Sequence, residues 1–167
     1  MDDLKRMLLK HMMNTQKITR IGVTAALYAS LTLVLWPISF GMIQLRVSEM
    51  LCLLAFIDPV YAIGVTLGCF IANIASPLGI VYITVGTLHT AISVFFISRS
   101  KSLLIASLWP TVFSVIIGAM ISIMTGAGFF ITTLYVMASE FIVVTLAGVP
   151  VFSYVIKSGR LAKVLNP

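Results

Sequence analysis

The chain has 167 residues, of which 60% are hydrophobic and 10% are charged, and its formal net charge is +6. Soluble domains are about half apolar and about a quarter charged, so this composition excludes a soluble enzyme, a disordered chain and a disulfide scaffold. We therefore expect a polytopic membrane protein, and we expect a single integral membrane domain over 1–167 because the apolar segments leave no room for a soluble domain.

Six apolar segments follow one another along the chain, with lengths close to what a helix needs to cross a membrane. The predicted helices are about 18–38, 43–57, 59–75, 81–97, 103–124 and 129–155. Asp58 and Pro59 predict a helix start, and we interpret Asp58 as a cap and nothing more. The segment from Thr125 to Gly128 predicts a tight turn. The pattern indicates an all-α membrane protein with six transmembrane helices.

Basic residues gather at both ends of the chain and in one loop. Ten of the eleven lie there: Lys5, Arg6, Lys10, Lys17, Arg20, Arg99, Lys101, Lys157, Arg160 and Lys163. With six crossings these segments all fall on one side of the membrane, and loops rich in Lys and Arg face the cytoplasm. We therefore expect a multi-pass protein of the cell membrane with both termini cytoplasmic. Anionic lipid head groups account for the basic ends, so no nucleic-acid partner is needed.

Arg46 and Glu49 are three residues apart near the outer end of the second predicted helix, so their side chains share one face. One hypothesis is a structural ion pair that anchors the helix end. The other is a polar pocket open to the outside, in which Glu49 contacts a ligand and Arg46 orients it. Gln44 would add a hydrogen-bond donor and an acceptor to the same pocket.

Glu140 is a second charged residue in an apolar setting. It lies about a dozen residues into the last predicted helix, where an ionised carboxylate is costly without partners or water. We therefore favour contact with a ligand or an ion over a structural role, and Tyr135 on the same helix fits a pocket wall. Asn73 and His89 are further candidates, although a lone His in an apolar helix is often a hydrogen-bonded packing residue.

Motifs of catalytic and metal sites are absent from the sequence, which contains no P-loop, no nucleophile motif and no zinc-binding spacing. We interpret Cys52 and Cys69 as small buried residues rather than as a disulfide or metal ligands. We therefore expect no metal, no cofactor and no enzymatic activity. Without a nucleotide-binding segment, uphill transport would draw its energy from a partner or an ion gradient.

Small residues recur one helical turn apart in two of the predicted helices. Ala25 and Ala29 form such a pair in the first helix, and Gly64 and Gly68 form another in the third. This spacing lets helix backbones approach closely in lipid. Packing within the chain and docking of a partner helix both remain open.

Several segments of the chain resemble the QueT family. They are FGMIQLRVSE at 40–49, YAIGVTLGCFIAN at 61–73, SPLG at 76–79, GTL at 86–88 and EFIV at 140–143. The resemblance covers about residues 18–157. It implies a six-helix S component of an energy-coupling factor (ECF) transporter, which captures a queuosine precursor, a 7-deazaguanine such as queuine or preQ1, at the outer face.

The resemblance also implies partners and roles. The partners would be a transmembrane coupling protein, which would dock at Ala25 and Ala29, and two ATPases that hydrolyse ATP. The candidate substrate-binding residues are Gln44, Arg46, Glu49, Asn73, Tyr82, His89, Tyr135 and Glu140. Carboxylates can accept N–H bonds from a guanine-type edge, and aromatic faces can stack on its ring.

Two positions depart from the family pattern. Tyr82 stands where an acidic residue is usual, and His89 stands where a small residue is usual. An S component for another vitamin or purine-like base therefore stays open as an alternative. A membrane-embedded hydrolase is a weaker alternative, because it would need a nucleophile or a metal set.

Overall fold

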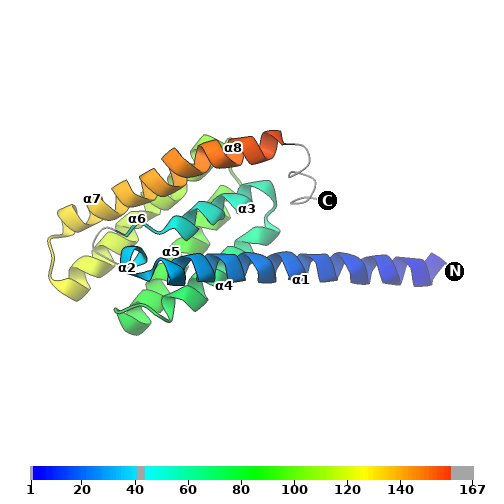
Figure 1. The fold of residues 1–167 in the computed structure, drawn as a ribbon, viewed down its shortest axis with the longest axis horizontal. Coiled ribbons are helices and arrows are strands. Elements are labelled where there is room, and N and C mark those ends of the chain that lie inside the picture. The colour runs from blue at the N-terminus through cyan, green and yellow to red at the C-terminus, as the bar shows by residue number, and fades with distance from the viewer. Residues whose placement is uncertain (1, 41–43, 159–167) are drawn as a thin grey trace.

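The structure is a computed structural model that describes residues 2–40 and 44–158, with side chains from residue 15 onward. All regular structure in these ranges is helical, which confirms the predicted fold class at that level. Figure 1 shows an elongated bundle in which the N-terminal part of the first helix extends beyond the other helices. The last helix ends at that same end of the bundle (Figure 1).

The elements follow the predicted order, with some differences in their limits. They are α1 (Asp2–Val34), α2 (Trp36–Ser39), η1 (Val47–Leu53), α3 (Leu54–Ile57), α4 (Val60–Asn73), α5 (Gly79–Ile97), α6 (Leu103–Thr125), α7 (Phe129–Glu140), η2 (Phe141–Gly148) and α8 (Val149–Lys157). The second predicted helix, 43–57, starts later than expected: residues 44–46 are irregular, and a 3-10 helix, η1, and the short helix α3 follow. The last predicted helix is continuous, but its middle part, η2, is a π-helix.

Three helical stretches are long and apolar enough to cross a membrane: Gly79–Ile97, Leu103–Thr125 and Phe129–Lys157. Val47–Ile57 and Val60–Asn73 are apolar but shorter. Helix α1 is not among these stretches, and it carries Lys17 and Arg20, which lower its mean hydropathy. Length and composition therefore support several membrane spans, but the number that they support in the described residues is three and not the predicted six.

Helices α1 and α4 pack closely because α4 carries glycines where they touch. A Cβ atom on Gly64 would lie 2.8 Å from the carbonyl oxygen of Ile21. A Cβ atom on Gly68 would lie 2.6 Å from the carbonyl oxygen of Ala25. Larger side chains would separate the two backbones, so the small-residue pair predicted in this helix serves close packing within the chain.

The predicted helix ends occur for the expected physical reasons, with one correction. Gly126 follows α6 with a φ of +72° and donates its N–H to the Ser122 carbonyl at 2.9 Å, as a C-terminal cap does. The Asp58 carboxylate accepts from the Val60 N–H at 2.9 Å. Asp58 is more than a cap, however, because its other oxygen pairs with Arg20 of α1 at 2.9 Å. This ion pair fixes the start of α4 against α1.

Candidate functional site

The centre of the bundle contains an ion pair between Arg46 and Glu49. The Arg46 Nη1 lies 3.5 Å from Oε1 of Glu49, and the two side chains are only 5% and 1% exposed. Arg46 immediately precedes η1 and Glu49 lies in its first turn. In a 3-10 helix, side chains three residues apart lie directly above one another, and this brings Arg46 and Glu49 together. The two side chains form an ion pair, as one of the two hypotheses drawn from their spacing expected, but the pair is buried in the protein.

The Glu49 carboxylate is held by three different elements. Its Oε1 accepts from the Tyr28 hydroxyl of α1 at 2.5 Å and from the Thr90 hydroxyl of α5 at 3.3 Å. Its Oε2 accepts from the Cys52 thiol of η1 at 3.0 Å. Because both oxygens already have partners, Glu49 ties α1, η1 and α5 together at one point.

Arg46 extends the same cluster to the end of α4. Its Nη2 donates to Oδ1 of Asn73, whose Nδ2 lies 3.3 Å from the Thr87 hydroxyl on α5. The Arg46 Nε has no hydrogen-bond partner among the described residues, although it is buried. A Cβ atom on Gly86 would lie 2.9 Å from Asn73 Nδ2, so the glycine leaves space for the side-chain amide of Asn73.

Aromatic rings cover the Arg46 guanidinium. Its central carbon lies 5.2 Å from the Phe40 ring centroid and 5.6 Å from that of Tyr82, within cation–π range. The Tyr82 hydroxyl donates to Gln44 Oε1 at 2.8 Å. The structure therefore brings together five of the predicted site residues: Gln44, Arg46, Glu49, Asn73 and Tyr82.

Glu140 is buried with an unsatisfied oxygen. It is the last residue of α7, directly before the π-helix η2, and is only 7% exposed. Its Oε2 has no hydrogen-bond partner among the described residues. A buried carboxylate oxygen without a partner is costly, and π-helical segments are frequent at functional sites. The surroundings of Glu140 therefore differ from those of the fully bonded Glu49.

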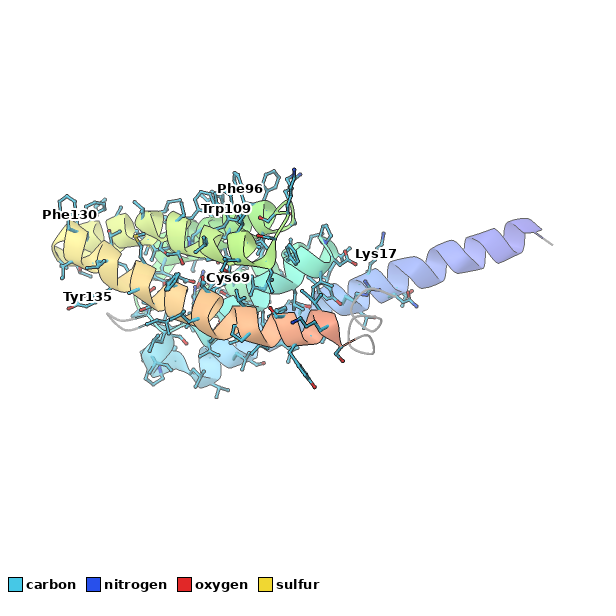
Figure 2. The ribbon with its side chains drawn as sticks, turned by 90° about the horizontal axis from the view of Figure 1, so that it is seen from above. Lys17, Cys69, Phe96, Trp109, Phe130 and Tyr135 are labelled. Carbon is cyan, nitrogen blue, oxygen red and sulfur yellow. The ribbon has the colours of Figure 1, made fainter. Side chains whose placement is uncertain are left out.

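His89 and Tyr135 lie outside the Arg46–Glu49 cluster. His89 is buried, and its Nε2 lies 3.1 Å from the Pro110 carbonyl oxygen of α6. Tyr135 is 42% exposed and lines a cavity of about 340 Å³ with Ile121, Thr125, Ala127, Ile131 and Thr132. Figure 2 shows Tyr135 near one end of the bundle, whereas Cys69, whose Sγ lies 3.9 Å from Arg46 Nη1, lies near its middle.

Comparison with known proteins identifies the family. The family model described as QueT transporter matches residues 18–157. The chain belongs to the QueT transporter family. A segment of 64 residues is 50% identical to the queuosine precursor transporter QueT of Lactococcus lactis subsp. cremoris (strain MG1363). That alignment covers 37% of this chain and 38% of the relative, and no solved structure matches the chain.

This QueT-family chain uses residues in its central cluster that the sequence analysis did not select. Tyr28 and Thr90 bond to Glu49, and Cys69 lies 3.3 Å from Asn73 Nδ2. Both cysteines are buried and free, as expected, but they also form hydrogen bonds, so they are more than packing residues. Spacing could have indicated this, since Cys52 is three residues after Glu49 and Cys69 is four before Asn73.

The small-residue pair of α1 lies inside this QueT-family protein. Ala25 and Ala29 are 4% and 7% exposed, and α4 covers that face of α1. A partner protein can dock only on an accessible surface, and Ala25 and Ala29 are buried. The neighbouring face of α1 is exposed and also carries small residues: Gly22, Ala26 and Ser30. A Cβ atom on Gly22 would meet nothing within 4 Å.

Proposed function

We propose that this protein is the substrate-binding S component of an ECF importer and that it captures a 7-deazaguanine precursor of queuosine. Membership of the QueT transporter family supports the transport role. The name of the Lactococcus relative supports the substrate class. The resemblance to ECF S components implies that the energy would come from two partner ATPases acting through a transmembrane coupling protein, and the sequence itself contains no P-loop.

The observation that carries the proposed substrate site is the unpartnered Oε2 of Glu140. A ligand N–H that donates to this oxygen would recover the free energy lost by its burial. The guanine-type edge of a 7-deazaguanine presents neighbouring N–H donors that suit a carboxylate. Arg46 Nε, also buried without a partner, supplies a donor for a ligand carbonyl.

The other site residues then have distinct roles. Glu49 holds Arg46 rather than the ligand, because both its oxygens are bonded within the protein. Phe40 is half-buried and presents aromatic surface for a base, and Tyr82, which is 1% exposed, packs edge to face against it at a centroid distance of 5.7 Å. Asn73 and Gln44 orient Arg46 and Tyr82 by direct hydrogen bonds. His89 and Tyr135 lie at the margin of this arrangement.

The proposed architecture is a single six-helix domain. Helices α1 and α4, together with η1 and α3, would complete the crossings begun by the three long apolar stretches. Both chain ends would be cytoplasmic, since Arg20, Arg99 and Lys157 are basic and positive loops face inward. Because α4 covers Ala25 and Ala29, the coupling protein would dock on the exposed face of α1 that carries Ala26 and Ser30.

Ligand titration of the purified protein tests this function. We expect queuine or preQ1 to raise the thermal unfolding temperature and to bind in calorimetry, whereas riboflavin as a control ligand has no effect. Mass spectrometry of small molecules that co-purify with the protein provides an independent identification. Binding of a different vitamin, with no response to either 7-deazaguanine, would contradict the proposed substrate.

A further inference from the structure

A surface groove runs between α4 and α5. Thr87 in its lining also contacts Asn73 of the Arg46–Glu49 cluster. It is an open groove with a volume of about 650 Å³, and its lining includes Pro59, Ile63, Leu67, Phe70, Ala91 and Phe95. Its walls are mainly apolar, and the Thr66 hydroxyl donates to the Ala62 carbonyl at 2.8 Å. Ile63 is 60% exposed on one wall and Phe95 is 50% exposed on the other. We call this feature the α4–α5 groove.

The length of the α4–α5 groove matches one leaflet of a bilayer. Its α4 wall extends from Pro59 to Phe70, which at 1.5 Å per residue is about 16 Å. Half of a hydrocarbon core about 30 Å thick is about 15 Å. An acyl chain aligned with α4 would therefore reach from the membrane surface to the midplane along this wall.

The only charged side chain in the groove lining stands at its mouth. Arg99 follows α5, is exposed, and places its guanidinium carbon 3.6 Å from the Phe95 ring centroid. One of its N–H groups donates to the Phe95 carbonyl at 3.3 Å. In the part of the chain that the structure describes, the ion pairs are Arg20–Asp58 and Arg46–Glu49, so no carboxylate neutralises Arg99. A guanidinium has five N–H donors, so Arg99 can donate further hydrogen bonds to an anion.

Aromatic side chains mark the level of Arg99 as a membrane interface. Phe96 and Trp109 lie together on α5 and α6, with ring centroids 4.7 Å apart (Figure 2). Phe113 stacks on Trp109 at 5.7 Å. The Trp109 indole N–H donates to the Ser100 hydroxyl in the α5–α6 loop, as in an interfacial aromatic belt. The mouth of the groove therefore lies where phospholipid phosphates are found.

We propose that the α4–α5 groove binds one anionic phospholipid of the leaflet whose surface lies at Arg99. The lipid phosphate pairs with the Arg99 guanidinium, and an acyl chain covers Ile63, Leu67 and Phe70. The negative charge of the head group complements the Arg99 guanidinium, which has no carboxylate partner in the described part of the chain. This charge complementarity favours a lipid over an apolar partner helix. This inference depends on the membrane location of the protein and is independent of the transported substrate.

Native mass spectrometry of the full-length protein, released from nanodiscs that contain equal amounts of phosphatidylglycerol and phosphatidylcholine, tests the proposal. We expect one phosphatidylglycerol to stay bound to the wild-type protein in preference to phosphatidylcholine. Arg99→Gln should weaken this preference about fivefold. Lys101→Gln is the matched control, because Lys101 lies in the same loop, is exposed and does not line the groove.

A second pair of variants tests the acyl-chain part of the groove. Ala91→Phe fills the groove and should remove the retained lipid, whereas Val112→Phe, at an exposed position of α6 outside the groove, should keep it. Equal retention of the two lipids by the wild-type protein, or an unchanged preference in Arg99→Gln, would overturn the proposal. A dimer that Ala91→Phe abolishes would also overturn it, because a second copy would then be the occupant.

Discussion

Glu49 and Glu140 are two buried carboxylates with opposite surroundings. Glu49 has hydrogen bonds on both oxygens, whereas Oε2 of Glu140 has none among the described residues. The sequence predicted both as site residues because a charge in an apolar helix is costly wherever it occurs. It could not separate their roles, since Tyr28 and Thr90, which satisfy Glu49, are distant in sequence and look like ordinary helix residues.

Glu140→Gln should lower affinity for the 7-deazaguanine ligand about ten- to a hundredfold while the protein stays folded. A charge-assisted hydrogen bond to a ligand contributes about 1.5–3 kcal/mol, and the amide loses one acceptor and the charge. Calorimetric titration measures the affinity, and thermal unfolding without ligand measures the stability. Unchanged affinity would assign Glu140 a structural role.

Arg46→Ala should lower the stability of the free protein and also weaken ligand binding. Removing one partner of a buried ion pair leaves the other charge uncompensated, which typically costs about 3–5 kcal/mol. The unfolding temperature without ligand is the direct measurement, and Lys101→Gln serves as the control because it removes an exposed cation. If Arg46→Ala unfolds at the wild-type temperature, the ion pair does not stabilise the fold.

The helical elements were predictable where the sequence carries local stop and start residues. Gly126 and Asp58 end or begin helices by their own conformations and side chains, and both predictions agree with the structure. The 3-10 form of η1 and the π-helical form of η2 have no comparable local pattern. In η1, the contacts of Glu49 with other helices accompany the tighter winding, and such contacts are not visible in a single sequence.

Substitution by Trp on the two small-residue faces of α1 should have different effects. Ala25→Trp should lower the unfolding temperature, because Ala25 is buried where Gly68 of α4 approaches its carbonyl. Ala26→Trp should leave folding and ligand binding unchanged, because Ala26 is exposed. Under the proposed function, Ala26→Trp should instead prevent co-purification with the coupling protein.

Thermal unfolding and a pull-down of the coupling protein, measured on both variants, separate these effects. Loss of stability in Ala26→Trp would show that this face packs within the protein. Full assembly of Ala26→Trp would exclude it as the docking face. The sequence alone could not choose between the faces, since small residues occur on both.

At the scale of the whole molecule, the exposed basic residues lie toward one end of the bundle, and the candidate site lies nearer its middle. Helix α4 starts just after Asp58, which pairs with Arg20, and ends at Asn73, which contacts Arg46. Helix α5 returns from Tyr82 to the basic α5–α6 loop. The candidate site therefore lies away from the end where the solvent-facing basic residues gather. This separation agrees with the proposed topology, in which the basic loops are cytoplasmic and the site faces outward.

Labelling of single cysteines in intact cells should establish the orientation. Lys101→Cys lies in the basic α5–α6 loop and should react with a membrane-impermeant maleimide only after the cells are opened. Gly128→Cys, in the turn before α7, should react from outside. A side chain fits at Gly128, because φ is −61° and a Cβ atom would meet only Ile131, at 3.4 Å. The native Cys52 and Cys69 are buried, so both should give little background. If Lys101→Cys is labelled from outside, the orientation is the opposite of the proposed one. The proposed site would then face the cytoplasm, where it could not capture an extracellular substrate.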